Sequence, residues 1–377
     1  MEIHLHIICL NVPYPVNYGG VFDLFYKLAA LQHQGVLIHL HCFDYGRGQQ
    51  TELNKYCTSV NYYQRNQGYK GLSAKLPYIV SSRKNEQLFE NLLKDAYPIL
   101  MEGIHCTYPL TDIRFANRKM YVRLHNVEYK YYYDLYKCAA LSFKKLYYLY
   151  ETKLLKKYEF IVANKATFLW AVSKKDVEVY SKEFRCTNID YLPLFLPDWK
   201  VECKEGMGIY CLFHGDLEIE GNEKIAIWLL KNVFAKTKLP FIISGKNPSK
   251  YLQKICHQLN SKLIANPSEA EMQELITEAH INILPSFNET GIKLKLLNAL
   301  FNGRHCVVNN AMIKSTDLAN LCHISNSALG MQQLIEQLFH QPFTKKEIEF
   351  RKNILLSQFN NEENAKYLVK SIWKNDL

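Results

Sequence analysis

Short apolar runs alternate with longer amphipathic stretches along the first half of the chain. The apolar runs predict strands at Ile3–Leu10, Val36–Phe43, Ile99–Glu102, Met120–Leu124 and Phe168–Val172. The stretches between them predict helices at Val21–Gln34, at Glu86–Asp95 and over a long region from about Val127 to Asn164. Strands that alternate with helices in this way are typical of βαβ units, which build a parallel sheet.

The same alternation restarts after a break at Tyr191–Asp198, where Pro193 and Pro197 bracket a short apolar segment. Predicted strands follow at Gly208–Phe213, Phe241–Ser244, Leu263–Ala265, Ile281–Leu284 and His305–Val308, separated by helices at about Asn222–Phe234, Ser249–Ser261, Glu269–Ala279 and Lys293–Phe301. The polar stretch Lys345–Trp373 predicts a last helix that crosses back onto the first domain.

These elements predict an N-terminal domain at residues 1–195, a C-terminal domain at 196–345 and a terminal helical segment at 346–377. Both domains are expected to be Rossmann-like α/β units with parallel sheets that face a central cleft. Ligands of open α/β sheets bind at the carboxyl ends of the strands. We therefore expect the functional residues in the loops that follow the strands.

Composition agrees with two folded domains. A chain of 377 residues exceeds the usual size of a single core, and its hydrophobic share of 48% can fill two. Eleven scattered cysteines without a CxxC pair indicate reduced thiols, and the first ten residues lack the features of a signal peptide. We therefore expect a cytoplasmic protein. The net charge of +10 indicates an anionic partner without identifying it.

The loop after Ile281–Leu284 carries the strongest local signal for chemistry. Thr290-Gly291 is expected to open a helix, whose unpaired N–H groups and positive dipole end suit a diphosphate. Gly291 permits close backbone approach, and Lys293 adds charge in the first turn. The alternative is an ordinary capped helix with a surface lysine.

Other predicted strand ends carry glycines. Gly215 and Gly245 each follow a strand of the second domain, and Lys246 would face a phosphate held there. In the first domain, Gly19-Gly20 stands at the start of the first helix, without the spacing of a dinucleotide or Walker loop. Such glycines let a ligand touch the backbone, although a tight turn would also require them.

His125 ends another predicted strand, within Arg123-Leu124-His125-Asn126-Val127-Glu128. An imidazole beside Asn126 and Glu128 is suited to binding substrate hydroxyl groups. A purely structural histidine is the alternative. Its expected place at the cleft distinguishes it from the other twelve histidines.

Together these loops resemble the retaining nucleotide-sugar glycosyltransferases of family 4, which have the GT-B fold. The resemblance rests on the Gly19-Gly20 loop, Arg123–Glu128, Trp170–Ser173 before Asp176, His214–Asp216, Ser244–Lys246 and Leu284–Gly303. It implies a hexosyltransferase that uses a UDP- or GDP-sugar and a glycan or lipid-linked acceptor in polysaccharide synthesis, with no cofactor.

The resemblance also implies residue roles. The base would lie near Asn266-Pro267 and Met272, and the diphosphate among Gly215, Gly245, Lys246, Lys293 and the Thr290-Gly291-Ile292 backbone. The acceptor would face Tyr18, Gly19 and Gly20, with Arg123 and Asn126 nearby. His125 and Glu289 are the candidate catalytic residues.

The sequence departs from the family at two places. Members typically carry two glutamates separated by seven residues, whereas Thr290 and Asn298 align with them here and Glu289 lies one place early. The usual arginine and lysine that bind phosphate after the first strand of the second domain are also absent. Lys246, Lys293 or Lys295 would replace them, and a non-catalytic nucleotide-sugar-binding homologue is an alternative.

The sequence contains no Asp-x-Asp and no close group of histidine, cysteine and carboxylate, so we expect no metal.

From Tyr129 to Tyr158, seven lysines and nine tyrosines suit either peripheral contact with an anionic membrane at its inner face or a long packed helix. Nucleic-acid binding is the rival from another class, but no recognised motif supports it. A nonhydrolysing sugar-nucleotide epimerase would need cleft carboxylates that the sequence does not identify.

Overall fold

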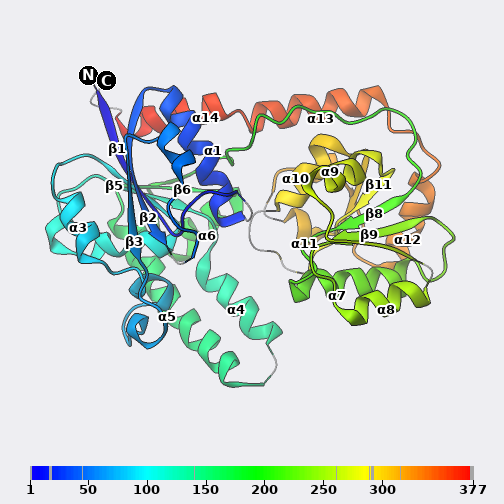
Figure 1. Ribbon diagram of the computed structural model, residues 1–377, viewed down its shortest axis with the longest axis horizontal. Helices are drawn as coiled ribbons and strands as arrows, with labels where there is room; N and C mark the ends of the chain where they lie inside the picture. The colour runs from blue at the N-terminus through cyan, green and yellow to red at the C-terminus, as the bar shows by residue number, and fades with distance from the viewer. Residues whose placement is uncertain are drawn as a thin grey trace. The chain divides into compact units, whose positions relative to one another are not determined.

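The computed structural model describes the chain except residues 1, 17–18, 45, 140, 260, 288, 290–292, 315 and 374–377, and except the side chain of Cys138. It forms two compact units (Figure 1). The first domain comprises the chain up to Pro197 and the segment from Phe359 onward, and the second comprises Asp198–Glu289 and Lys293–Gln358. Each is described separately.

The first domain contains a seven-stranded parallel sheet in the order β3-β2-β1-β4-β5-β6-β7. Its strands are β1 (Ile3–Cys9), β2 (Val36–Asp44), β3 (Ser59–Gln64), β4 (Ile99–Glu102), β5 (Met120–Leu124), β6 (Phe168–Ala171) and β7 (Ile189–Tyr191). Its helices are α1 (Gly19–His33), α2 (Tyr78–Ser81), α3 (Glu86–Leu92), α4 (Glu128–Cys138), α5 (Phe143–Lys165), α6 (Lys174–Glu183) and α14 (Asn361–Ile372).

The second domain contains a six-stranded parallel sheet in the order β10-β9-β8-β11-β12-β13. Its strands are β8 (Cys211–His214), β9 (Phe241–Gly245), β10 (Lys262–Ala265), β11 (Ile281–Ile283), β12 (His305–Val308) and β13 (His323–Ile324). Its helices are α7 (Glu220–Trp228), α8 (Lys250–Gln258), α9 (Glu269–Glu278), α10 (Leu294–Asn302), α11 (Asn310–Ile313), α12 (Ala328–Leu338) and α13 (Lys345–Gln358).

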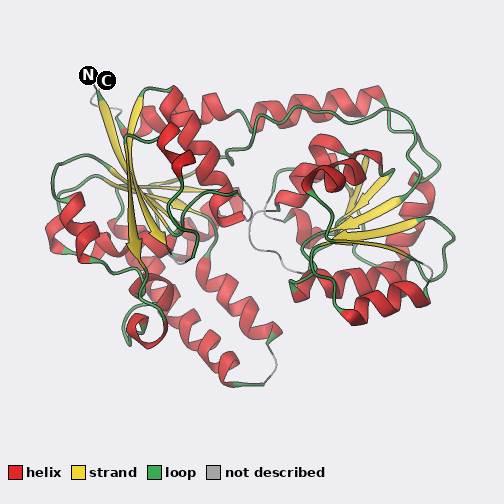
Figure 2. Cartoon of the chain, viewed as in Figure 1, coloured by secondary structure: helices red, strands yellow, loops and turns green. Residues whose placement is uncertain are grey.

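Two Rossmann-like α/β domains with parallel sheets are thereby confirmed, and Figure 2 shows the strands of each sheet between layers of helices. Consecutive β1 side chains divide between two buried clusters: Ile7 packs with α1 and α14, and Ile8 packs with α3 and α5. This division follows from the two-residue side-chain period of a strand that is covered on both faces. In both domains the strand order reverses beside the first strand, which places the expected ligand edge at the carboxyl ends of β1 and β8.

Three edge strands and one helix boundary differ from the sequence-based expectation. The sequence pattern does not predict β3, β7 and β13, which lie at the edges of their sheets, where burial imposes a weaker apolar pattern. The region expected as one helix from Val127 to Asn164 is two helices, α4 and α5, which pack against each other. Within the described ranges, every helix is too short or too polar to cross a lipid bilayer.

The segment expected as a linker is built into the first domain. Leu192 and Phe195 are buried, and the Phe195 N–H donates to the Asp23 carboxylate at 2.9 Å. The polar tail, expected as one helix, is broken before α14, where the Asn360 side chain accepts from the Glu363 N–H at 3.1 Å. Consequently α13 lies in the second domain, and α14 lies beside α1 in the first (Figure 1).

Candidate active site

The carboxyl ends of β4 and β5 and the first helix of the first domain share a buried group of charges. Lys27 donates to Asp23 at 3.0 Å and to Glu102 at 2.7 Å. Arg123 binds the same Asp23 through Nε at 3.0 Å and Nη2 at 3.1 Å. Burial alone would raise the pKa of Asp23, but Arg123 and Lys27 hold it far below its ordinary value. Asp23 therefore stays ionised and ties α1 to the sheet.

Arg123 was predicted to bind the acceptor, but its guanidinium is used within the domain. Besides Asp23 it donates to the carbonyls of Leu192 at 2.6 Å and Pro193 at 3.0 Å, and the side chain is 1% exposed. A fully buried guanidinium with these partners positions the chain after β7 and cannot contact an acceptor. The assignment to acceptor binding is corrected on this ground.

His125 is oriented by the same group. Its Nε2 lies 3.0 Å from the Glu102 carboxylate, whose other oxygen accepts from Lys27. Burial favours a raised pKa for Glu102, but Lys27 and His125 outweigh it, and its pKa is lowered. The ionised Glu102 therefore assigns the imidazole proton to Nε2, which leaves the Nδ1 lone pair as an acceptor.

Two buried polar atoms close to His125 have no hydrogen-bond partner among the described residues, the Nδ1 of His105 and the Oδ1 of Asn126. Gly103, at φ +78°, lies against both imidazoles. A Cβ there would lie 3.1 Å from His105 Nδ1 and 3.7 Å from His125 Nδ1. Buried polar atoms are rarely left unpaired in native structures. These atoms are suited to the hydroxyl groups of a polar ligand.

Acidic residues lie in the first turns of α4 and α6. Burial raises the pKa of Glu128, at the start of α4, to about 7, although an Asn126 hydrogen bond opposes the rise. Burial likewise raises the pKa of Asp176, in the first turn of α6, to about 6. Carboxyl groups with pKa values in this range are able to exchange protons near neutral pH.

In the second domain, Lys295, which was expected only as a replacement for the absent phosphate-binding residues, lies at the end of β8. Lys295 donates to the Asn222 side chain at 3.1 Å, and its ammonium lies 5.2 Å from the centre of the Phe213 ring. No carboxylate of the described residues lies within ion-pair distance of it. The neighbouring His214 is buried, its Nε2 is unpartnered among the described residues, and burial followed by Lys295 lowers its pKa to about 3.

Lys293 stands two residues earlier, as the N-cap of α10. The helix begins at Leu294, so Lys293 precedes the first turn in which it was expected. Burial lowers the pKa of Lys293 to about 8, against the raising effect of Glu289. Burial followed by the charge of Lys293 lowers the pKa of Lys295 to about 8 as well. Two partly desolvated ammonium groups thus lie close to each other, an arrangement that an anion would stabilise.

The two predicted glycines of this domain fix the shape of the loops. A Cβ on Gly245 would lie 1.9 Å from the Gly215 carbonyl oxygen, so no side chain fits there. The Gly215 N–H donates to the Ser244 carbonyl at 3.1 Å, which holds the two strand ends together. A Cβ on Gly215 would meet Asn222 at 3.4 Å. Gly215 therefore lies beside Asn222, the partner of Lys295, and Gly245 packs against the backbone of Gly215.

The remaining predicted donor residues are dispersed. Lys246 is exposed, and Met272 is half-buried on α9. The Asn266 side chain accepts from the Asn247 N–H at 2.7 Å and so links the loop after β10 to the loop after β9. Asn298 accepts from Asn302 at 2.8 Å, and Glu289 pairs with Lys314. Gly19 and Gly20 form the first turn of α1, whereas Tyr18 and Thr290–Ile292 lie outside the described residues.

Four candidate site residues had no assigned role of their own in the sequence-based prediction: His105, Glu128, His214 and Lys295. Glu128 and His214 stand inside the quoted motifs, so their signal was present in the sequence. Lys295 was named only as a replacement for the absent phosphate-binding residues. His105 follows β4 and Gly103, and the glycine at this strand end was a signal that the prediction did not use.

Comparison with known proteins identifies the domain type. Residues 208–338 match the family model described as Glycosyl transferases group 1. A protein in the cps region of Klebsiella pneumoniae, an uncharacterized 44.6 kDa chain, is 27% identical over 315 residues, which cover 78% of this chain and 80% of that protein.

Solved structures are similar over nearly the whole chain. S. aureus TarM, as a mutant in complex with Fondaparinux, alpha-GlcNAc-glycerol and UDP, is 11% identical with a TM-score of 0.69, and the match covers 99% of this chain and all of that one. Anabaena Alr3699/HepE in complex with UDP and glucose is 11% identical with a TM-score of 0.66, at the same coverage. These likenesses establish the GT-B fold, and the family match confirms the predicted enzyme class. The chain thus has the GT-B fold, and most of its second domain is similar to the Glycosyl transferases group 1 model.

Proposed function

We propose that this protein transfers a sugar from a UDP-sugar to a glycan or lipid-linked acceptor, without a catalytic metal and with retention at the anomeric carbon, as in family 4. UDP is favoured over GDP because TarM and HepE were solved with UDP. The Klebsiella relative from a cps region favours a role in polysaccharide synthesis.

The observation that carries the proposal is Lys295 at the end of β8, together with Lys293 at the N-cap of α10. A nucleoside diphosphate would offset the charge of two desolvated ammonium groups and accept a hydrogen bond from each. The same pair would stabilise the charge that develops on the departing diphosphate, a task that a divalent metal performs in other enzymes. The unpartnered Nε2 of His214 supplies a further polar contact.

The affinity for UDP is expected to decrease as the pH rises through about 8. Each lysine has a pKa of about 8 in the free protein, and the diphosphate favours the protonated form. The affinity for UDP is therefore highest below pH 8, and above that pH it falls by up to about tenfold per pH unit for each lysine.

Lys295→Met should weaken UDP binding about 10- to 100-fold at pH 7, because a charge-assisted hydrogen bond is lost. Isothermal titration calorimetry measures both effects.

Lys236→Met, which changes an exposed lysine of the same domain, is the matched control and should bind UDP as the wild type does. Lys246→Ala shows whether the exposed lysine of the β9 loop contributes as well. GDP, ADP and an oligonucleotide complete the panel. Unchanged UDP affinity in Lys295→Met, or binding of the oligonucleotide alone, would refute the proposal. UDP binding without sugar transfer would instead identify a non-catalytic homologue.

Two further parts of the proposal are tested on the working enzyme. Full transfer activity in EDTA would support metal independence, and loss that Mg²⁺ restores would contradict it. Retention is expected from the family resemblance alone. The residues give it no separate support, because Asn298 stands at a position where members carry a glutamate. Proton NMR of the newly formed glycosidic linkage distinguishes retention from inversion.

We also propose that the α4–α5 hairpin contacts an anionic membrane at the cytoplasmic face. Leu141 and Phe143, where α4 turns into α5, are 95% and 93% exposed, and Leu146 is 65% exposed. Lysines flank this tip and lie over tyrosine rings, with Lys137 4.4 Å from the Tyr133 ring centre. Exposed apolar side chains that are ringed by lysines and tyrosines match the interface of a bilayer with anionic headgroups.

Cosedimentation with vesicles tests this surface. The protein should bind vesicles that contain phosphatidylglycerol and not vesicles of phosphatidylcholine alone, and binding should weaken with salt. Phe143→Ser should reduce binding about tenfold, since the burial of a phenylalanine side chain is lost. Ile113→Ser, at a residue that is 86% exposed elsewhere in the first domain, is the control. Equal binding to both vesicle types, or to neither, would exclude the proposed contact.

A further inference from the structure

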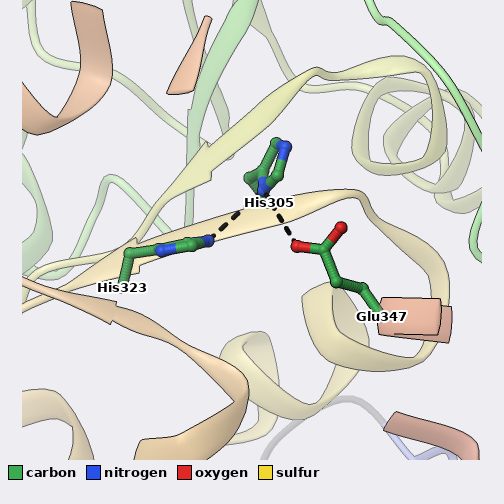
Figure 3. A group of neighbouring side chains, drawn as sticks. All are labelled: His305, His323 and Glu347. Atoms are coloured by element: carbon green, nitrogen blue, oxygen red, sulfur yellow. Dashed lines mark hydrogen bonds and ion pairs between the residues drawn. The ribbon is translucent and has the colours of Figure 1, made fainter. Parts of the chain in front are cut away.

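Three side chains that are distant in the sequence converge in the second domain. His305 begins β12, His323 begins β13, and Glu347 lies in the first turn of α13 (Figure 3). His305 Nδ1 lies 3.3 Å from His323 Nε2 and 3.9 Å from Glu347 Oε1. All three ligand atoms lie within 4.8 Å of one another. The two histidines lie at the amino-terminal ends of β12 and β13, whereas Lys295 lies at the carboxyl-terminal end of β8.

Two of the three side chains are held by a second partner. His305 Nε2 lies 3.0 Å from the Gln341 carbonyl, so this nitrogen carries the proton and Nδ1 keeps its lone pair. Glu347 Oε2 accepts from the Thr344 N–H at 2.8 Å and from its hydroxyl at 2.7 Å, which leaves Oε1 directed at His305. Such outer contacts orient the ligands of metal sites.

The chemical types of the three side chains also fit a metal. Two imidazoles and one carboxylate are side chains that bind zinc.

The spacing of the two imidazoles agrees with tetrahedral zinc, and the carboxylate oxygen lies slightly farther away, at 3.9 Å from His305 Nδ1. Nitrogen ligands about 2.0–2.1 Å from zinc lie roughly 3.3 Å apart in a tetrahedron, close to the distance between the two imidazoles. A cavity of about 80 Å³ lies beside the group and is lined by His323, Glu347 and Arg351 among others. It has room for a water molecule next to two of the three side chains.

A second group of potential ligands, Asp23, Glu102 and His125 in the first domain, does not share these features. The Lys27 ammonium lies 3.0 Å from Asp23 and 2.7 Å from Glu102. It already supplies the positive charge that a metal would bring, so the group carries no metal proposal.

We propose that His305, His323 and Glu347 bind one divalent transition-metal ion, with zinc as the best match. The ion fastens the first turn of α13 to β12 and β13 and stabilises the second domain. It takes no part in sugar transfer, because its ligands stand at the sheet edge opposite to the proposed diphosphate site. The inference is therefore independent of the proposed function.

Zinc titration of the EDTA-treated, dialysed full-length chain tests the site. Calorimetry should show one Zn²⁺ per chain, and Glu347→Gln should weaken the affinity at least about tenfold. Glu349→Gln, which changes an exposed glutamate of the same helix, should match the wild type within about twofold. Zinc at ~100 times its Kd should raise the melting temperature of the wild type by about 5 °C or more.

His323→Asn provides a second variant, since His323 is half-buried and less critical to folding than the buried His305. Cobalt(II) bound to the wild type should show the visible absorption of a four-coordinate ion, and this signal should be lost in His323→Asn. UDP affinity should be the same with and without zinc. Wild-type affinity for zinc in both ligand variants, or no zinc binding at all, would overturn the proposal.

Discussion

Asp23→Ala is expected to destabilise the first domain by about 3–5 kcal/mol, the cost of removing one partner from a buried ion pair. Asp23 is the shared partner of Lys27 and Arg123, which are both buried, and it also accepts the Phe195 N–H. Its loss leaves two cations with Glu102 as the remaining carboxylate. Hydrogen exchange of the β1 and β5 peptides measures the free energy of opening for this domain alone.

Asp134→Ala is the control for this prediction. Asp134 pairs with Lys137 at 3.5 Å on α4 and is 34% exposed. A pair of this kind contributes about 0–1 kcal/mol. If Asp23→Ala costs no more than Asp134→Ala, the buried group does not hold the first domain together.

His125→Ala should lower the turnover number about 100-fold and leave UDP affinity within about twofold. The physical reason is that Nδ1 is the free acceptor of an imidazole whose Nε2 is fixed by Glu102. It is thereby placed to accept the proton of an acceptor hydroxyl, whereas the proposed UDP contacts lie in the second domain. Steady-state kinetics with calorimetry separates turnover from nucleotide binding.

His33→Ala, at an exposed histidine at the end of α1, should leave both quantities unchanged. Glu102→Gln provides a second comparison, because it removes the charge that fixes the proton on Nε2. It should lower turnover and shift the pH profile of the reaction. Equal losses of turnover and UDP affinity in His125→Ala would assign His125 to plain binding.

The general location of the site could be predicted, but the identity of several groups could not. A glycine at a strand end is visible in the sequence, so Gly215 and Gly245 were found, and the contact between them gives the reason. Lys246 was predicted to face the phosphate because it follows a strand end, with Lys293 and Lys295 as further candidates. The structure leaves Lys246 exposed and brings Lys295 to Asn222 instead. Which lysine reaches a strand end depends on how α10 packs.

Arg123 illustrates the opposite difficulty. Its place at the end of β5 made it a candidate for acceptor binding, as with His125 two residues later. Side chains two residues apart on a strand point to the same face, yet Arg123 turns to the buried Asp23, 100 residues away in the sequence. No local sequence pattern indicates that Asp23 is the partner of Arg123.

The sequence by itself determined the two α/β domains, the central strands and the loops that carry chemistry, because burial on both faces of a parallel sheet imposes an apolar pattern that is local. Only the tertiary structure decided which charges neutralise each other. It buried Arg123 against Asp23, left Lys295 beside His214 without a carboxylate among the described residues, and brought His305, His323 and Glu347 together. Such groups form across elements far apart in the chain, and their energies depend on distances and burial that no local pattern encodes.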